Sequence, residues 1–240
     1  MTRPTVRIIA VGDELLTGRT IDSNSRRIQR ALGGAAHPVA EVRVVPDAAP
    51  AIAAALAGTR EGELVVVSGG LGSTPDDLTR DAVAGWAGVA LEEDPAVRAR
   101  LEERWRRRGL RRSPGVARQC QVPAGMTALA NPVGSAPGLV GSLRGRALVL
   151  LPGVPAELEG LLPIVVDHLR GLGMLPAPRP TRLWRTAQVA ELAVVERCEP
   201  VRRRHPDLAW AWWLTEWGVD VRLTAERDGA QEELAAAGDA

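Results

Sequence analysis

The sequence contains no lysine, no tyrosine and no phenylalanine. A Walker-type phosphate loop needs a lysine, and so does an enzyme that forms a Schiff base, so both classes are excluded. An RNA-recognition sheet, which stacks bases on phenylalanine or tyrosine, is excluded as well. All 30 basic side chains are therefore arginines, and together with the abundant alanine and glycine this indicates genomic composition rather than selection at any one site.

Cysteine and histidine are also scarce. Cys120 and Cys198 have no Cys-x-x-Cys partner, which predicts inert thiols in a reducing compartment and no structural zinc. The three histidines lie far apart and form no pair at helical spacing, so a zincin-type site is not expected.

Charge and hydropathy point to the same compartment. A formal net charge of +1 gives no global field that would attract nucleic acid or a membrane, so an anionic ligand has to be captured locally. The N-terminus lacks the apolar core of a secretory signal, and no window approaches the length of a membrane span. We expect a cytoplasmic protein that contacts neither membranes nor nucleic acid.

Short apolar strands alternate with helices through the first two thirds of the chain. The runs that end at glycine, serine, proline or aspartate predict strands at 6–11, 40–45, 63–67 and 147–151. The segments with helical spacing predict helices at 23–32, 48–57, 77–86, 95–108 and 161–169. This alternation is typical of an α/β fold, in which helices flank a largely parallel sheet.

A proline- and glycine-rich stretch at 171–180 predicts a boundary between residues 1–172 and a small α+β module at 180–240. In the module we expect strands at 182–189, 208–213 and 219–224, and a helix at 192–204.

Tryptophans crowd one strand of this module. Alternation places Trp210 and Trp212 on one face and Trp213 on the other, which favours core or dimer contacts over base stacking. We therefore expect a homodimer.

Three predicted strands end at acids or glycines. They lead into Gly12-Asp13-Glu14, Pro46-Asp47 and Ser68-Gly69-Gly70, and Asn24 begins the next helix. In open α/β sheets ligands bind beyond the carboxyl ends of the strands, so the site is expected there. Capping and surface turns remain alternative explanations for Asp13, Glu14 and Asp47.

The segment SGGLGSTPDDLTRD, residues 68–81, carries the sharpest signal. Its glycines at 69, 70 and 72 permit close backbone approach, so main-chain N–H groups can line a phosphate. Thr74 adds a hydroxyl, and Asp76 and Asp77 can hold a Mg²⁺ or Mn²⁺ ion that bridges the same phosphate. The alternative is that one of the two aspartates caps the helix that follows.

Two later loops, NPVGSAPG at 131–138 and LPGVPAEL at 151–158, would alone indicate turns, and Pro155 can equally begin a helix. Between the two halves of the first domain, 98–112 interleaves arginines with Glu102 and Glu103. The spacing favours a solvated helix with internal ion pairs, and it leaves open that one arginine binds a substrate phosphate.

Together, GDELLTGRTIDSNS, SGGLGSTPDDLT, NPVGSAPG and LPGVPAEL resemble, in the same order, the N-terminal part of the competence/damage-inducible CinA family. The resemblance covers most of residues 6–170. It implies the three-layer α/β/α fold of molybdopterin-binding domains such as MogA and MoaB, and, more weakly, a KH-like module at the C-terminus.

The resemblance also implies a site and an activity, the metal-dependent hydrolysis of ADP-ribose at its pyrophosphate. It assigns catalysis to Asp47, Asp76 and Asp77, and a divalent cation (Mg, Mn or Co) to Asp13, Glu14 and Asp76. The expected ligand-binding residues are Gly12, Asn24, Gly69, Gly70, Gly72, Ser73, Thr74, Asn131 and Gly138.

The chain departs from the family pattern in three places. Ser73 replaces the usual proline, no residues follow Ala240 to form the deamidase domain of long members, and 187–192 lacks the usual Gly-Glu-Ser element of the module. Deamidase activity is therefore not expected. Two further hypotheses stay open: pterin binding with adenylyl transfer to molybdopterin, and a non-catalytic nucleotide-binding module.

Overall fold

The computed structural model describes residues 4–33, 39–109, 114–175, 179–227 and 230–238. The chain divides into two compact units, Met1–Ala31 with Pro38–Pro176, and Leu32–His37 with Ala177–Ala240. Within the described residues, no helix is both long and apolar enough to cross a bilayer.

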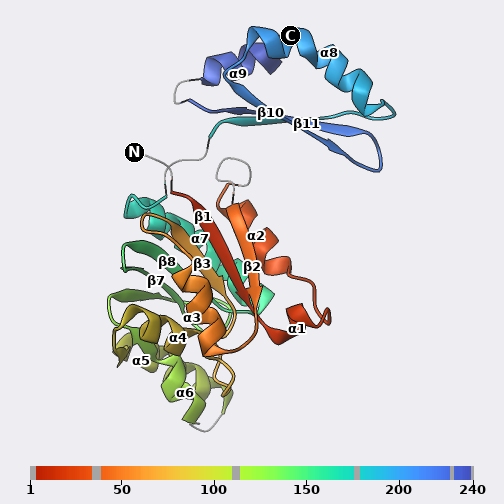
Figure 1. Cartoon of the computed structure of the whole chain (residues 1–240). Helices are drawn as coiled ribbons and strands as arrows, with labels where there is room; N and C mark the ends of the chain where they lie inside the picture. The colour runs from red at the N-terminus through yellow and green to blue at the C-terminus, as the bar shows by residue number, and fades with distance from the viewer. Residues whose placement is uncertain (1–3, 34–38, 110–113, 176–178, 228–229, 239–240) are drawn as a thin grey trace. The chain divides into compact units, whose positions relative to one another are not determined.

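The first unit is built on a six-stranded sheet with the order β2-β1-β3-β8-β7-β6 (Figure 1). The strands β2, β1, β3 and β8 run parallel, and β7 and β6 continue the sheet antiparallel. The strands are β1 (Val6–Val11), β2 (Val39–Val45), β3 (Leu64–Ser68), β6 (Met126–Leu129), β7 (Gly138–Leu143) and β8 (Arg146–Leu151). A separate two-stranded ribbon pairs β4 (Leu91–Glu93) with β5 (Gln121–Pro123).

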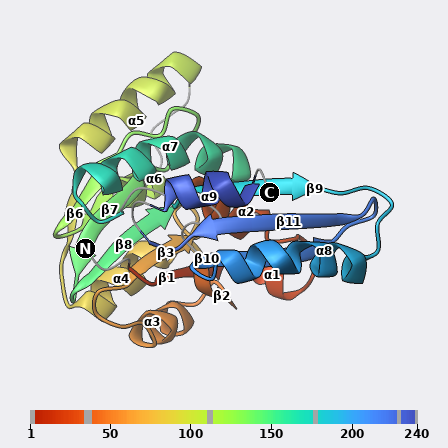
Figure 2. The same cartoon turned by 90° about the horizontal axis from the view of Figure 1, so that it is seen from above.

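Helices cover both faces of this sheet, as Figures 1 and 2 show: α2 and α7 on one side, α3 and α4 on the other. The helices of this unit are α1 (Asp13–Leu16), α2 (Ser23–Ala31), α3 (Ala49–Ala57), α4 (Thr79–Ala87), α5 (Pro95–Arg108), α6 (Pro114–Gln119) and α7 (Pro155–Gly171). All five residues of β3 are buried, because the strand lies between two helical layers. The predicted α/β/α fold is confirmed.

The second unit is an antiparallel sheet of the order β10-β11-β9 with α8 and α9 on one face. Its elements are β9 (Thr181–Arg185), α8 (Glu191–Arg204), β10 (Leu208–Leu214), β11 (Val219–Ala225) and α9 (Gln231–Gly238). Trp210 and Trp212 pack against the apolar core under the helices, whereas Trp213 lies half-exposed beneath the Arg222 guanidinium. The predicted alternation of the tryptophans is confirmed.

Several predicted boundaries are wrong. Helix α7 begins at Pro155, not at residue 161, because proline fits the first helical position. Helix α4 begins at Thr79 rather than at residue 77. Strand β9 ends at Arg185 rather than at 189, since Gln188 has a positive φ of 56° and turns the chain.

The antiparallel edge of the first sheet escaped the sequence analysis altogether. Strand β6 has only four residues, and Gly138 and Gly141 interrupt the apolar pattern of β7. Both glycines are needed for packing: a Cβ on Gly141 would stand 2.7 Å from the Gly125 carbonyl oxygen.

Candidate functional site

The parallel strands of the first unit end level with one another. Val11 pairs with Val45, Ala10 with Ser68, and Ser68 with Leu151. The segments that follow β1, β2, β3 and β8 therefore meet at one edge of the sheet, where the strand order reverses between β1 and β3. We call this place the strand-end crevice; it is formed by residues 12–14, 46–47, 69–77 and 152–153.

The backbones after β1 and β2 are joined through their aspartates. Asp13 N–H donates to Asp47 Oδ2 at 2.9 Å, and Asp47 N–H donates to Asp13 Oδ1 at 3.4 Å. Gly12 N–H is already used by the Val45 carbonyl, at 3.0 Å. The reciprocal pair fixes both carboxylates at the mouth of the crevice and leaves an oxygen of each open.

Four acids share one electrostatic environment here. Burial raises the pKa of Asp47 above its usual range, and the charges of Glu14, Asp13 and Asp76 raise it further, against the lowering effect of the Asp13 hydrogen bond. Asp76 is exposed, and its polar surroundings, the nearby Thr74 side chain first, lower its pKa. Acids from two other segments, those after β1 and β3, thus lie close enough to influence Asp47, which follows β2.

The glycine turn after β3 passes very close to its neighbours. Gly69 has a φ of 110°, and a Cβ there would stand 2.2 Å from the Val11 carbonyl oxygen. Gly70 has a φ of 64°, and a Cβ there would stand 2.3 Å from Thr79 Oγ1. Only glycine fits both positions without moving β1 or α4.

Asp77 organises this turn. Its carboxylate accepts from Gly72 N–H at 2.7 Å, from Thr74 N–H at 2.8 Å and from the Thr74 hydroxyl at 2.5 Å. The capping alternative is wrong for both aspartates, because α4 begins after Leu78 and has no side-chain cap.

A buried arginine supports the same turn from below. The Arg80 guanidinium is 3% exposed and donates to the carbonyls of Leu71 at 2.7 Å and Gly72 at 3.4 Å. Burial lowers its pKa to about 10, so the side chain stays charged at neutral pH. Arg80 thus holds two carbonyls of the turn from the inside of the protein.

Some backbone N–H groups of the glycine turn already donate hydrogen bonds within the protein, and others do not. Gly69 N–H donates to Leu151 O and Gly72 N–H to Asp77, so neither is available to a ligand. Within the part of the chain that the structure describes, Gly70, Leu71 and Ser73 N–H make no hydrogen bond. Of these, Gly70 and Ser73 are at least partly exposed, so their N–H groups are the ones that could donate to a phosphate.

Asn24 borders a small cavity of about 140 Å³ between the acids and the start of α7. Its Nδ2 donates to Gly153 O at 2.8 Å and to Ser68 Oγ at 3.2 Å, while its Oδ1 is buried with no partner among the described residues. A buried acceptor without a partner, on a residue that lines a cavity, is a feature that a ligand hydroxyl or amine could satisfy.

The two ligand-binding residues predicted farther along the chain make contacts within the protein. Asn131 uses its whole amide inside the protein: Nδ2 donates to Ala136 O and Glu157 Oε2, and Oδ1 accepts from two loop N–H groups. Gly138 is buried, and a Cβ there would press on Leu161. Their role in binding stays a prediction.

The acids of the crevice suit a cation that is held by one or two carboxylates and otherwise by water and substrate. No three His, Cys, Asp or Glu side chains of the described residues stand at coordinating spacing. An all-protein cage is therefore not formed by these residues. Mg²⁺ commonly binds through one or two carboxylates, with water and substrate phosphates completing its shell, and the free oxygen of Asp13, with the Glu14 carboxylate next along the chain, suits that mode.

A family model described as "Probable molybdopterin binding domain" matches residues 7–171, more than half of the chain. The crystal structure of the protein CinA from Thermoplasma acidophilum, described as of unknown function, matches 70% of this chain and 98% of its own. The two are 33% identical, with a TM-score of 0.64. The chain is a CinA-like member of this family. CinA-like proteins of Gemmatimonas aurantiaca and Myxococcus xanthus are each 37% identical to it over 96% of its length. It spans only 56% of those relatives.

Sequence reasoning missed several residues of this CinA-like site. Arg80 could have been noticed as a cation directly after the acid-rich turn, although its burial could not. Glu157 holds Asn131, and its place in the first turn of α7 is visible only once Pro155 is taken as the helix start. Ser68 and Gly153 act through a hydroxyl and a carbonyl, for which the sequence has no signal.

Proposed function

We propose that this CinA-like domain is a divalent-cation-dependent hydrolase of nucleotide pyrophosphates, with ADP-ribose as its leading substrate. The observation that supports it best is the Asp47 carboxylate: its pKa is raised, and it lies in a cluster of acids beside a glycine turn with open N–H groups. A base with a raised pKa accepts a proton from water more readily.

Each part of the crevice has a role in this reaction. The N–H groups of Gly70 and Ser73 hold the pyrophosphate, and Asp77 and Arg80 keep the turn in the shape that presents them. Asn24 Oδ1 orients a ribose hydroxyl. A divalent cation on the Asp13 and Glu14 oxygens, when bound, supplies charge that neutralises the pyrophosphate.

The chemical step is a hydrolysis. Asp47 orients a water molecule and takes one of its protons while the water oxygen bonds to one phosphorus. The bridging phosphorus–oxygen bond breaks, and the bridging oxygen leaves with the other phosphoryl group. From ADP-ribose the products are AMP and ribose 5-phosphate.

The test is AMP release from ADP-ribose by the full chain with magnesium, manganese or cobalt. We expect turnover that is lost by at least about a hundredfold in Asp47→Asn, as for removal of a general base. Asp167→Asn, on an exposed part of α7, is the matched control and should keep full activity. Absence of AMP with every metal would refute the proposal.

A second candidate, pterin binding with adenylyl transfer, is supported by the family match over residues 7–171. Pterin fluorescence that copurifies with the chain, without hydrolysis of ADP-ribose, would favour it. A third, a non-catalytic module, predicts ligand binding by calorimetry without turnover, unchanged in Asp76→Asn and Asp77→Asn. The expected dimer and cytoplasmic location also remain proposals.

A further inference from the structure

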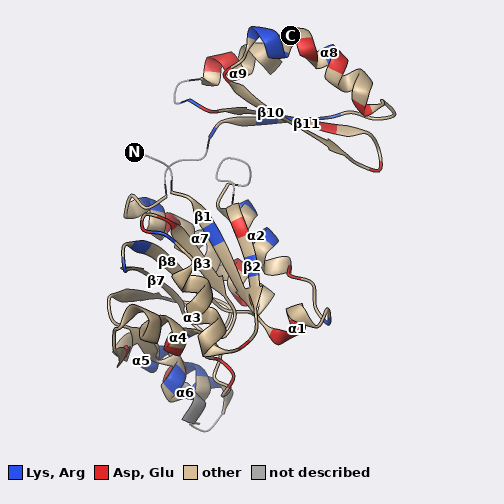
Figure 3. Cartoon of the chain, in the orientation of Figure 1, with Lys and Arg blue, Asp and Glu red and all other residues tan. Residues whose placement is uncertain are grey.

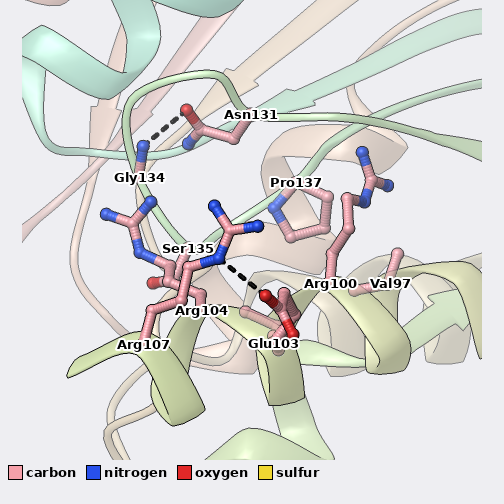
Figure 4. A pocket seen from close by; sticks show the side chains of 10 residues that line it. Val97, Arg100, Glu103, Arg104, Arg107, Asn131, Gly134, Ser135 and Pro137 are labelled. Atoms are coloured by element: carbon pink, nitrogen blue, oxygen red, sulfur yellow. Dashed lines mark hydrogen bonds and ion pairs between the residues drawn. The ribbon is translucent and has the colours of Figure 1, made fainter. Parts of the chain in front are cut away.

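A concentration of positive charge borders a cavity beside helix α5. A cavity of about 460 Å³ separates α5 from the loop 131–137. Figure 4 shows Arg100, Arg104 and Arg107 reaching from the helix toward this loop. We call it the arginine cavity. Among the described residues that line this cavity, Asn131 is the only one that was predicted to bind a ligand.

The three arginines share one face of α5 because their spacing is four and three residues. Glu103 is the one acid of the lining, so the formal charge of the cavity wall is three minus one, or +2. A cavity lined by one sign of charge concentrates counter-ions of the opposite sign.

The arginines differ in how far the protein already uses them. Arg107 pairs with Glu103 at 2.6 Å, so its charge is balanced. Arg104 donates to the Val133 carbonyl at 2.9 Å, a neutral acceptor that holds the side chain in place without cancelling its charge. Arg100 makes no hydrogen bond or ion pair with any residue that the structure describes.

The opposite wall is rigid and supplies a hydroxyl. Asn131 closes the loop on itself through Val133 and Gly134 N–H, and Glu157 anchors Asn131 to α7. Ser135 Oγ accepts from Gln119 at 3.2 Å, which leaves the hydroxyl proton of Ser135 free to donate into the cavity.

We propose that the arginine cavity binds a small phosphorylated anion, with two phosphoryl groups meeting Arg100 and Arg104 and the Ser135 hydroxyl completing the contact. Arginine is the side chain best suited to phosphate, because its planar fork donates two hydrogen bonds. The two arginines are one helical turn apart, which lets adjacent phosphoryl groups each meet a guanidinium.

A small anion fits the cavity better than nucleic acid does. A volume of 460 Å³ lies within the range of small-molecule sites. Stacking of single-stranded bases requires aromatic faces, and none of the lining side chains is aromatic. The inference does not depend on the reaction proposed above, since it concerns binding alone.

The experiment is isothermal titration of the full chain with inorganic pyrophosphate at low ionic strength, with EDTA present to suppress cation-bridged binding at the crevice. We expect saturable binding with a dissociation constant of about 1 mM or tighter, which two or three charge-assisted contacts supply. The affinity should fall about tenfold in Arg100→Gln and further in the double variant with Arg104→Gln.

Two more variants sharpen the result. Arg203→Gln is the control for loss of one exposed arginine charge, because Arg203 is 78% exposed, pairs with Glu199 and belongs to the second unit. It should bind as the unaltered chain does. Glu103→Gln removes the acid of the cavity and should tighten binding.

Three outcomes would overturn the inference. They are no saturable binding to the unaltered chain, equal affinity in the Arg100→Gln/Arg104→Gln variant, and binding of a thymidine oligonucleotide where pyrophosphate does not bind. Failure of ADP-ribose hydrolysis would leave the inference intact, since neither arginine belongs to the crevice.

Discussion

The strand-end crevice and the arginine cavity lie in the same unit and are built in opposite ways. In the crevice, main-chain groups of several strands are bonded to one another, and the side chains of Asp77 and Asp47 accept hydrogen bonds from backbone N–H groups. In the cavity, arginines of one helix reach across to a loop, and the helix itself needs none of them to form. Figure 3 marks the basic and acidic residues along the ribbon.

This difference predicts how each site responds to substitution. A change in the crevice disturbs strands and turns at once, so stability and function change together. A change in the arginine cavity removes a contact with the ligand and little else. The four predictions below test that contrast, beginning with the largest effect on stability.

Gly69→Ala should destabilise the chain most. The new Cβ would collide with the Val11 carbonyl oxygen, 2.2 Å away, at a φ of 110° that alanine rarely adopts. We expect a loss of about 2–4 kcal/mol in the free energy of unfolding, measured by thermal or urea denaturation.

The matched control for this change is Gly85→Ala in helix α4. A Cβ on Gly85 meets no heavy atom within 4 Å, so alanine should stabilise the helix by about 0.5–1 kcal/mol. Equal stability of the two variants would mean that the glycine turn does not press against β1.

Asp77→Ala should come next. It removes the acceptor for three donors of the turn, and unsatisfied donors there cost about 1–3 kcal/mol. Asp76→Ala, one position earlier and fully exposed, should leave the unfolding midpoint unchanged. If Asp76→Ala proved the more damaging of the two, the turn would be organised by the other aspartate.

The two predictions above concern the glycine turn after β3, whose position could be predicted from the sequence but whose internal contacts could not. The buried strands Val6–Val11 and Leu64–Ser68 were predicted well because β-branched runs between helical layers leave little choice. The glycines and acids that follow these strands predicted where the strand-end crevice lies. The structure gives the two aspartates different roles: Asp77 accepts hydrogen bonds from the turn, whereas Asp47 keeps one carboxylate oxygen without a partner among the described residues. These roles depend on which N–H group each oxygen contacts, and the sequence pattern does not predict those contacts.

The second unit and the α5 region were predicted less completely for a physical reason. Helix α9 is short and weakly amphipathic, and the ribbon of β4 and β5 has three residues in each strand. Such elements form because tertiary contacts hold them, not because their own propensity does. The internal ion pairs of α5 were expected from spacing and are confirmed; the cavity beside them depends on the loop 131–137.

Asp47→Asn should increase the free energy of unfolding slightly, whereas Gly69→Ala and Asp77→Ala should decrease it. The raised pKa means that the folded chain binds more protons than the unfolded chain above the usual aspartate range, so stability falls as pH rises through that window. Removing the charge should therefore stabilise the chain at neutral pH, by less than about 1 kcal/mol for this partly exposed group. Urea denaturation at pH 3 and pH 7 measures it: the gain should be present at pH 7 and absent at pH 3. A loss of stability at pH 7 would contradict the raised pKa.

Arg107→Gln should change stability least. An exposed ion pair four residues apart on a helix contributes about 0.3–0.5 kcal/mol, and glutamine preserves the helix propensity of the position. The same change in α8, Arg203→Gln, should cost the same amount, because the exposure and the spacing from the glutamate match. Urea denaturation of the two variants therefore measures whether contacts across the cavity add to the stability that the Arg107–Glu103 pair gives to α5. If Arg107→Gln cost more than about 1 kcal/mol beyond Arg203→Gln, the arginine would hold the loop 131–137 in place, and the two sites would not differ in kind.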